Sequence, residues 1–417
     1  MQALSRMVNT TAAFKIASFR RFLTARFFLT MAIQLQSVAL GWQVYDLTKD
    51  PLSLGLTGLF EALPYMAILL FSGHWADVYK RKTIAVRAIS LFAVCAIFLT
   101  FIAFNIFNFD TAAQLASLYA AAGLIGLSRG LAGPSIQSML PQIVPRELLA
   151  NAITWNTSAW QVASVSGPAV GGLVYGFYGK EVTYMLCAVL VLVSLVLFTT
   201  LPSFAPSQAI KEPIIKSLRK GLSFVWNNNL VLSAISLDLF AVLFGGAVAL
   251  LPIFADKILH TGPEGLGILR AAPAIGAIIM GMVIVRFPIM RNSGLVLLTA
   301  VGLFGCCIIG FALSEIYWIS FVLLLMSGAF DAISVIIRTN ILQFLTPDEM
   351  RGRVTAVNSI FIGSSNEIGA FESGLAAKIM GLIPSVIFGG SMTIGITLFA
   401  GIFAPKLRNL HLRDHVN

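Results

Sequence analysis

The sequence is short of charged residues, which make up 11% of its 417 positions, against about 25% in soluble domains. Hydrophobic residues make up 58%, and no soluble fold buries that much apolar surface. The composition therefore excludes a large aqueous domain. The sequence also lacks a glycine-rich phosphate loop, a nucleophile elbow and zinc-ligand spacing, so we expect neither an enzyme nor ATP-driven transport by this chain.

Cysteine is equally scarce. The four cysteines, Cys95, Cys187, Cys306 and Cys307, lie within apolar runs, and this placement favours neither a disulfide framework nor a metal site. The N-terminal segment has no apolar core followed by a small-residue cleavage site, so we do not expect a removable signal peptide. We expect no metal and no cofactor.

The sequence does contain a series of apolar runs, each long enough to cross about 30 Å of hydrocarbon. They predict an all-α membrane protein with twelve transmembrane helices in two pseudo-symmetric six-helix bundles. The predicted domains are an N-terminal bundle over 1–200, a cytoplasmic linker over 201–228 and a C-terminal bundle over 229–417. The predicted spans are 22–47, 53–75, 83–106, 112–139, 148–178, 182–200, 229–255, 263–286, 293–313, 316–345, 354–380 and 384–404.

Positive charge is distributed unevenly between the segments that join these spans. Of the 28 Lys and Arg residues, Arg26, Arg129, Arg270 and Arg338 are counted as lying inside spans and are set aside. Arg87, Arg286 and Lys378 lie near the end of a span and are counted with the adjoining segment, which leaves 24. With the N-terminus in the cytoplasm, 20 of these lie on the cytoplasmic side and four on the other, namely Lys49, Lys180, Lys257 and Lys378. This bias follows the positive-inside rule. We predict that both termini are cytoplasmic, and the net charge of +10 then needs no nucleic-acid partner.

The two predicted halves repeat each other at a constant spacing. Pro145-Arg146-Glu147-Leu148 returns 202 residues later as Pro347-Asp348-Glu349-Met350, and the same offset takes Gly167 to Gly369. Internal repeats of this kind are typical of transporters, whose substrate path lies between the repeats.

Charge does not follow the repeat. An offset of 209 takes Glu61 to Arg270, and an offset of 202 takes Arg129 to Asp331. One half therefore carries an acid where the other carries a base. We expect a central cavity that differs in charge between its two halves and is nearly neutral in sum.

Charged residues inside the predicted spans are the candidate functional residues, because a charge in hydrocarbon is costly and by default marks a substrate or ion path. Arg26 is an exception, since it lies one turn into its span and can snorkel to the headgroups. Trp155 is added as a ring on which an aromatic ligand can stack, with packing between helices as the alternative. The substrate-cavity candidates are Glu61, Arg129, Trp155, Asp238, Arg270, Asp331, Arg338 and Glu372.

Proton coupling requires a carboxylate that gains and loses a proton at accessible pH. Burial raises a carboxyl pKa toward that range, and a nearby arginine lowers it. Asp238 and Glu61 are the first candidates, followed by Asp331 and Glu367. An interhelical ion pair that never titrates is the alternative for each. Arg338 follows Asp331 by seven residues, or two helical turns, so we expect the two to share a cavity wall.

The second predicted span ends in Gly73-His74-Trp75-Ala76-Asp77-Val78-Tyr79-Lys80-Arg81-Lys82. This stretch resembles the loop signature of the major facilitator superfamily between its second and third helices, although Trp75, Val78 and Lys80 depart from it. The resemblance implies a conformational gate formed by Gly73, Asp77, Arg81 and Lys82, in which the aspartate latches the outward-facing state. The departures leave the contact partner of this gate open.

Gly167-Pro168-Ala169-Val170-Gly171-Gly172 is a set of small residues within the fifth predicted span. On its own such a set forms either a packing notch or a hinge. It is similar to the fifth-helix signature Gly-Pro-x-x-Gly-Gly of the superfamily's antiporters, which implies an antiporter-like hinge at Gly167, Pro168, Gly171 and Gly172. We expect these residues to seal the fifth span against the eighth, near Arg270. Arg129 with Gly133 is similar to the fourth-helix arginine motif, which implies a part in proton handling.

The stretches Thr24-Ala25-Arg26-Phe27 and Thr346-Pro347-Asp348-Glu349-Met350-Arg351-Gly352-Arg353-Val354 resemble the bacterial enterobactin exporter group, which also contains drug efflux proteins. The resemblance implies a monomeric inner-membrane antiporter that exports a siderophore or drug-like molecule by alternating access, driven by the proton gradient. Its expected partners are this small-molecule substrate, protons and membrane lipid. An importer or uniporter of the same fold is the first alternative, and a non-transporting receptor or scaffold is the second.

Overall fold

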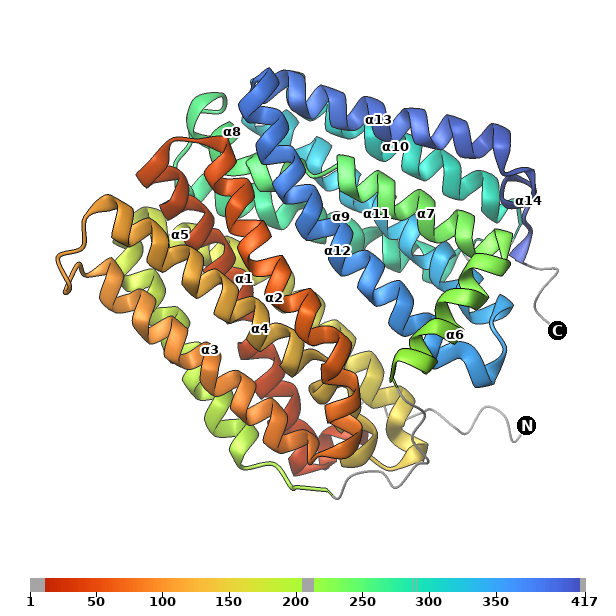
Figure 1. Ribbon diagram of the computed structural model, residues 1–417, viewed down its shortest axis with the longest axis horizontal. Helices are drawn as coiled ribbons and strands as arrows, with labels where there is room; N and C mark the ends of the chain where they lie inside the picture. Colours follow the sequence, from red (N-terminus) through yellow and green to blue (C-terminus); the bar gives the residue numbers. More distant parts are fainter. Residues whose placement is uncertain (1–11, 205–213, 288, 290, 413–417) are drawn as a thin grey trace. The chain divides into compact units, whose positions relative to one another are not determined.

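The computed structural model describes residues 12–204, 214–287, 289 and 291–412, and all the regular elements in these ranges are helices (Figure 1). The N-terminal part contains η1 (Ala12–Lys15), α1 (Ala17–Thr48), α2 (Pro51–Val78), α3 (Arg81–Ala103), α4 (Thr111–Ile143), η2 (Arg146–Leu148) and α5 (Leu149–Thr199). The remainder contains α6 (Ile214–Asn227), α7 (Asn229–Phe244), η3 (Ala247–Leu250), α8 (Leu251–Lys257), α9 (Pro263–Arg286), α10 (Ser293–Leu313), α11 (Tyr317–Leu345), α12 (Asp348–Met380), α13 (Leu382–Phe403) and α14 (Pro405–Arg408).

The predicted all-helical membrane fold is confirmed. Ten segments of the described chain are long and apolar enough to span a membrane. The fifth and sixth predicted spans share the label α5, and Gly179, whose φ of 82° is not helical, divides it into two helices. The eleventh predicted span lies within α12, which has 33 residues but is too rich in polar side chains to be among the ten. Counting α5 twice and adding α12 gives 10 + 1 + 1 = 12 spans.

The seventh predicted span, 229–255, is not a single helix. Helix α7 ends at Phe244, and the chain continues through η3 into the short helix α8. Gly245 and Gly246 follow Phe244 directly, and two adjacent glycines favour the end of a helix because they lose more backbone entropy than other residues when they become helical.

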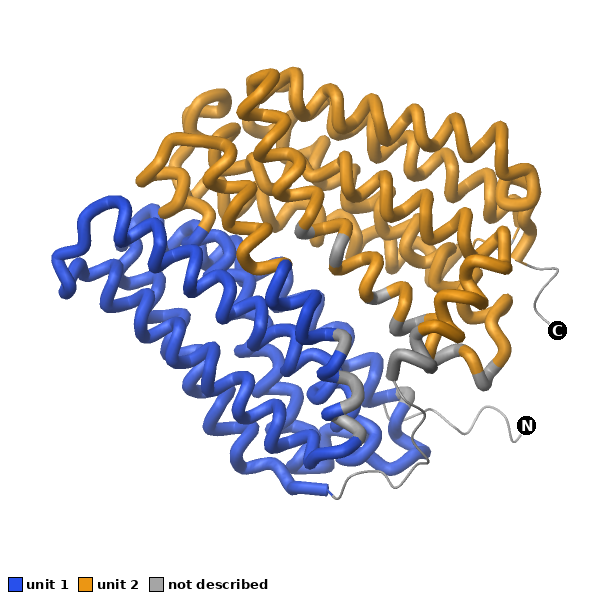
Figure 2. The backbone as a smooth tube through the Cα atoms, viewed as in Figure 1, with its two compact units in different colours: residues 1–40, 63–210 blue, residues 41–62, 211–417 orange. Residues whose placement is uncertain are grey.

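The chain folds into two compact units, which are coloured separately in Figure 2. Unit 1 comprises residues 1–40 and 63–210, and unit 2 comprises residues 41–62 and 211–417. Residues 41–62, which form the end of α1 and the beginning of α2, therefore group with the C-terminal part of the chain.

Unit 1 is held together by close packing of small and apolar side chains. Helix α3 packs against both α4 and α5. The Ser128 hydroxyl on α4 donates to the Ala88 carbonyl on α3 at 2.7 Å, and the Ser194 hydroxyl on α5 donates to the Ala25 carbonyl on α1 at 2.8 Å. Small residues let helices approach closely in a membrane, where a hydroxyl between two helices adds a hydrogen bond.

Unit 2 is built on the pairs α9 with α11, α10 with α11 and α10 with α13. Helices α9 and α11 approach backbone to backbone, because a Cβ atom on Gly276 would collide with the Leu325 carbonyl and one on Gly328 with the Pro273 carbonyl. Helix α6 lies within the predicted linker and packs on α12. A Cβ on Gly221 of α6 would lie 2.9 Å from the Arg353 carbonyl oxygen.

The contact at Gly276 gives a test of unit 2. We expect Gly276→Ala to destabilise the protein by about 1–3 kcal/mol, because the added methyl group forces α9 away from α11. The control is Gly281→Ala on the same helix, where a Cβ would meet nothing within 4 Å. Thermal unfolding in detergent measures both variants. Equal midpoints for the two variants would contradict the close approach.

Candidate functional site

Two buried side chains of unit 2 form an ion pair between α7 and α11. Arg338 Nη1 contacts Asp238 Oδ1, and the two side chains are 4% and 8% exposed. The pair neutralises both charges where water is excluded, and this neutralisation is the condition for keeping a charged residue inside a membrane helix. Arg338 thus has a direct partner on another helix.

A small cavity adjoins this ion pair. It has a volume of about 10 Å³ and is lined by Asp238, Ala241, Val242, Val301, Phe304, Asp331 and Ser334. Its lining is mostly apolar, but two carboxylates and a hydroxyl reach it, and a cavity of this size has room for about one water molecule. The structure thus places Asp331 and Asp238, on α11 and α7, at one cavity.

The two carboxylates at the cavity differ in their surroundings. Asp238 faces the Arg338 guanidinium. For Asp331, which is partly buried, the described residues supply no hydrogen bond or ion pair. A carboxylate without a cation in a water-poor site is stabilised by taking up a proton, whereas a paired carboxylate is not. The two carboxylates therefore differ in their counter-charge: Asp238 has the Arg338 guanidinium, and Asp331 has no cation among the described residues.

The glycine set of α5 lies against α1 within unit 1. A Cβ on Gly167 would lie 2.6 Å from Gln34 Cβ, and one on Gly171 would lie 3.0 Å from Leu35 Cα. Pro168 lies inside the helix, and Gly172 is buried. The close contact of Gly167 and Gly171 is thus with α1, and the expected seal of the fifth span against the eighth near Arg270 stays a prediction.

Two candidates of unit 1 lie beside aromatic rings. The Arg129 guanidinium carbon lies 5.7 Å from the centre of the Tyr65 ring, so α4 presents a cation to an aromatic face on α2. The Trp155 ring packs edge-on against Phe14, with centroids 4.8 Å apart. Trp155 thus has an aromatic contact within the protein itself.

The remaining cavity candidates, Glu61, Arg270 and Glu372, also belong to unit 2. They lie on helices other than α7 and α11, which carry the Asp238 ion pair. Glu61 is partly buried on α2, and Glu372 is partly buried on α12. Arg270 lies on α9 beside the end of α1, where its Nη1 atom would be 3.8 Å from a Cβ on Gly41. The side chain of Glu367 lies outside the described residues.

The predicted gate is described only in part. The side chains at Gly73 and Asp77 lie outside the described residues. Arg81 donates to the Ser138 carbonyl of α4 at 2.7 Å. Lys82 donates to the carbonyls of Thr199 and Leu201 at 2.7 and 2.5 Å. The bonds of Lys82 bring a cation to the end of α5, where carbonyls lack intrahelical partners.

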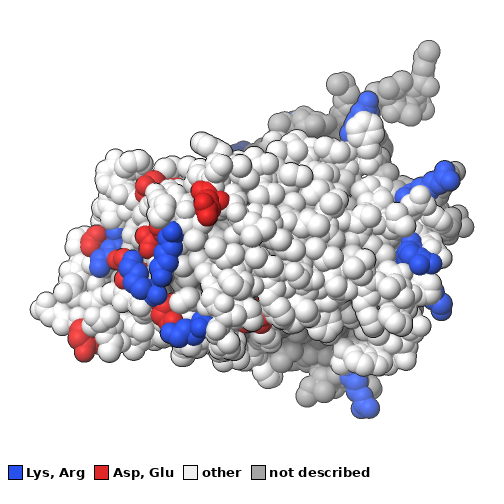
Figure 3. Space-filling model, turned by 90° about the horizontal axis from the view of Figure 1, so that it is seen from above, with Lys and Arg blue, Asp and Glu red and all other residues white. Residues whose placement is uncertain are grey.

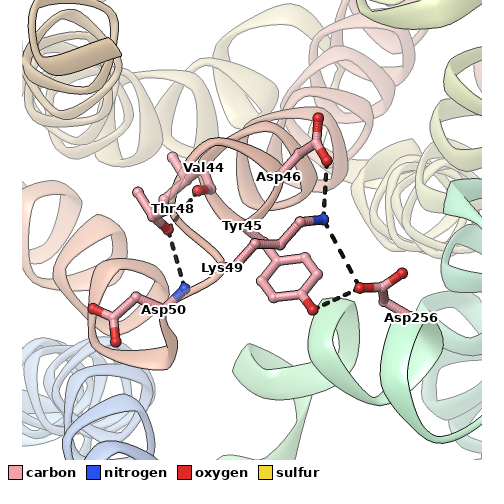
Figure 4. Close-up of polar contacts among 7 residues, drawn as sticks. All are labelled: Val44, Tyr45, Asp46, Thr48, Lys49, Asp50 and Asp256. Atoms are coloured by element: carbon pink, nitrogen blue, oxygen red, sulfur yellow. Dashed lines mark hydrogen bonds and ion pairs between the residues drawn. The ribbon is translucent and has the colours of Figure 1, made fainter.

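A polar cluster that the sequence did not reveal lies where α1 ends (Figure 4). The Tyr45 hydroxyl donates to Asp256 Oδ2 on α8 at 2.7 Å. Lys49 Nζ lies 3.0 Å from Asp46 Oδ1 and 3.9 Å from Asp256 Oδ2, and 4.7 Å from the centre of the Tyr45 ring. The cluster ties the end of α1 to α8 within unit 2.

Asp50, in the connection between α1 and α2, forms a second link within unit 2. Lys378 Nζ of α12 lies 2.7 Å from Asp50 Oδ1, and the Ser53 hydroxyl donates to Oδ2 at 3.2 Å. Partial burial alone raises the pKa of Asp50, but the Lys378 ammonium and the Ser53 donors outweigh it and lower that pKa below its ordinary value. We name the contacts of Tyr45, Lys49, Asp50, Asp256 and Lys378 the outer cluster.

Sequence reasoning used Lys49 and Lys378 only to count charge on one side of the membrane. The signal that could have singled them out is their rarity, because only four cations were assigned to the non-cytoplasmic side. Two of these four carry contacts of the outer cluster. Tyr45 and Asp256 carried no signal of their own, since they lie 211 positions apart in sequence.

Comparison with known families gives a match over almost the whole chain. The model of the transmembrane secretion effector family, within the major facilitator superfamily, matches residues 8–416. Two similar proteins carry the name enterobactin exporter EntS. The one from Shigella boydii serotype 18 (strain CDC 3083-94 / BS512) is 26% identical over 407 residues, and the one from Escherichia coli O139:H28 (strain E24377A / ETEC) is 26% identical over 409. Each alignment covers 95% of both chains.

Solved transporters share the fold. A POT family transporter in complex with 5-aminolevulinic acid aligns with a TM-score of 0.73 and 14% identity, over 93% of this chain and 96% of that one. A bacterial homologue of the lysosomal transporter Spinster, in an inward-facing and unoccupied conformation, aligns with a TM-score of 0.72 and 14% identity, over 97% and 98%. At this level of identity the likeness concerns the fold alone.

The Asp238 ion pair gives a test by double-mutant cycle. We expect Arg338→Met to destabilise the protein by about 3–5 kcal/mol, because it leaves the Asp238 carboxylate buried without a cation. Adding Asp238→Asn should recover most of this loss, because it removes the unpaired charge. The free energy of unfolding in mixed micelles is measured for Arg338→Met, for Asp238→Asn and for the double variant. A double variant as unstable as the sum of the single ones would show that the two side chains do not interact.

The outer cluster gives a second test. We expect Lys378→Gln to raise amide hydrogen exchange in residues 41–62 by about 1.5- to 5-fold, the range for an exposed ion pair. The exchanged pair Asp50→Lys with Lys378→Asp should restore protection, and Lys180→Gln is the matched control. Because the pKa of Asp50 is lowered, the link should persist above its ordinary pKa, near 4, and weaken as pH falls through the lowered value. Unchanged exchange in Lys378→Gln would contradict the link.

Proposed function

This chain belongs to the transmembrane secretion effector family of the major facilitator superfamily, and we propose that it is a proton-coupled antiporter that exports a small organic molecule. It is a multi-pass membrane transporter, and the proposal concerns its direction, its coupling ion and its substrate. The observation that carries the proposal is the cavity of unit 2 at which a paired carboxylate and an unpaired one meet.

We propose that Asp331 is the group that takes up and releases the proton. Asp238 forms an ion pair with Arg338, so its charge is already compensated. Asp331 lines the same cavity without a cation, and one water molecule there would connect the two carboxylates. Protonation removes the charge of Asp331 and changes the cost of keeping it away from water, which biases the conformations between which a transporter alternates.

Other candidates keep supporting roles in this proposal. Glu61, Arg270 and Glu372 on α2, α9 and α12 are proposed to line the substrate path together with Trp155. Arg129, whose charge rests against Tyr65, is proposed to take part in proton handling. Glu367 remains a further carboxylate candidate. Gly73, Asp77, Arg81 and Lys82 are proposed as the cytoplasmic gate, in which Arg81 and Lys82 anchor α3 to α4 and to the end of α5.

Export is supported by two observations. The fifth-helix glycine set, whose sequence is similar to the antiporter signature, packs closely on α1 through Gly167 and Gly171. The relatives with 26% identity are named enterobactin exporters, which supports a siderophore or drug-like substrate.

An importer or uniporter of the same fold is the second candidate, and uptake that rises with an inward proton gradient would favour the importer. A receptor or scaffold would move no probe at all.

The proposed orientation places both termini in the cytoplasm of a bacterium and the chain in its inner membrane. On the face drawn in Figure 3, acidic residues gather toward one end among Lys and Arg, whereas the described charges seen at the opposite end are Lys and Arg. That distribution supports the orientation, because cations are retained on the cytoplasmic side. The outer cluster then lies on the non-cytoplasmic side, where release of residues 41–62 from α8 and α12 would accompany opening.

The proposal is tested with the purified protein in proteoliposomes and with enterobactin and ethidium as probes. A difference of one pH unit supplies about 1.4 kcal/mol per proton, so a one-to-one antiporter should build up about a tenfold probe gradient. We expect Asp331→Asn to exchange probe across the membrane but to build up no gradient. Asp110→Asn is the control, because asparagine keeps the N-cap that Asp110 supplies to α4. Gradient-driven accumulation that survives in Asp331→Asn would reject Asp331 as the proton carrier.

A further inference from the structure

A second cavity of unit 2 lies at the end of α6, far along the chain from the Asp331 cavity. It has a volume of about 370 Å³ and is lined by Phe224, Asn227, Asn228, Asn229, Leu230 and Lys406. Helix α7 packs against both α6 and α14, so this cavity opens where three helices meet. The transport proposal assigns no role to it.

The lining of this cavity favours an anion. Lys406, at the beginning of α14, is an exposed cation, and none of the six lining residues is acidic. Asn228 uses its Oδ1 atom to accept from the Val231 N–H at 3.2 Å as the N-cap of α7, and the free part of that side chain is therefore the amide donor Nδ2. A cation and amide donors without a carboxylate match a phosphate group.

The surroundings of the cavity are apolar and exposed. Trp226, which directly precedes Asn227, is 67% exposed, and Leu222 lies one turn earlier on α6. Phe403, three residues before Lys406, is 69% exposed. Arg219 and Lys220 on α6 are exposed as well. Tryptophan, apolar side chains and cations next to one another are typical of the membrane interface, where the tails and the headgroups of lipids meet.

We propose that this cavity binds the headgroup of an anionic phospholipid. The phosphate lies against the Lys406 ammonium and the Asn228 amide, and the acyl chains run along Trp226 and Phe403. Charge complementarity selects an anionic lipid, and the exposed apolar side chains select a ligand that has tails. The bound lipid fastens α6, which lies in the predicted linker between the two bundles, to the beginnings of α7 and α14.

The test measures binding of phosphatidylglycerol to the full-length protein in detergent by native mass spectrometry, with phosphatidylcholine as the neutral lipid. We expect Lys406→Gln to weaken phosphatidylglycerol binding about fivefold, the effect of one cation near an anionic surface. Asn229→Trp fills the cavity and leaves every charge in place, so it should weaken binding to a similar degree. Lys180→Gln removes a cation elsewhere and should leave binding unchanged.

Three outcomes would overturn the proposal. Equal losses in Lys406→Gln and Lys180→Gln would show that the lipid responds to net charge alone. Full binding in Asn229→Trp, with the variant folded by its thermal midpoint, would place the lipid outside the cavity. Competition by inorganic phosphate at concentrations similar to those of the lipid would identify the cavity as a site for a free anion. None of these readouts depends on transport, so they stand apart from the test of Asp331.

Discussion

The interior of unit 2 depends on the neutralisation of charge inside the membrane. Asp238 and Arg338 come from α7 and α11, and each would be costly in hydrocarbon without the other. Their contact fixes one side chain of α7 against one of α11. It also provides one of the two carboxylates that line the neighbouring cavity with a cation. An arginine already paired with one carboxylate is less available to a second one. Asp331 lines the cavity with no cation beside it among the described residues, and this difference is the basis of the proposal that it carries the proton.

The sequence was sufficient for the fold because membrane spans are set by length and apolarity, two properties that are local. The prediction for 293–313 coincides with α10 and that for 263–286 with α9. It failed locally where backbone geometry interrupts an apolar run, because Gly245 and Gly246 end α7 early. The predicted break between the fifth and sixth spans is present at Gly179, whose φ of 82° is not helical.

The site was less predictable because partners come from different helices. The expectation that Arg338 shares a cavity wall with Asp331, seven residues away, stays a prediction. The ion pair of Arg338 with Asp238, which is 100 residues earlier, was not predicted. Rotation of each helix about its own axis decides such pairings, and a sequence alone does not contain that rotation. The same holds for Asp50 and Lys378, whose contact spans 328 positions.

The repeat shows which features the two halves hold in common. Gly167 packs on Gln34 of α1 in unit 1, and Gly369 packs on Leu243 of α7 in unit 2. The offsets are 369 − 167 = 202 and 243 − 34 = 209 residues, the same two offsets that relate the halves in sequence. Close packing of a small residue therefore recurs at equivalent places. The charges do not recur, since Arg129 meets a tyrosine ring whereas its counterpart Asp331 lines a cavity. Steric fit is needed in both halves to form the fold, whereas the proposed coupling to protons requires a single titrating group, so under that proposal function is expected where the repeat is broken.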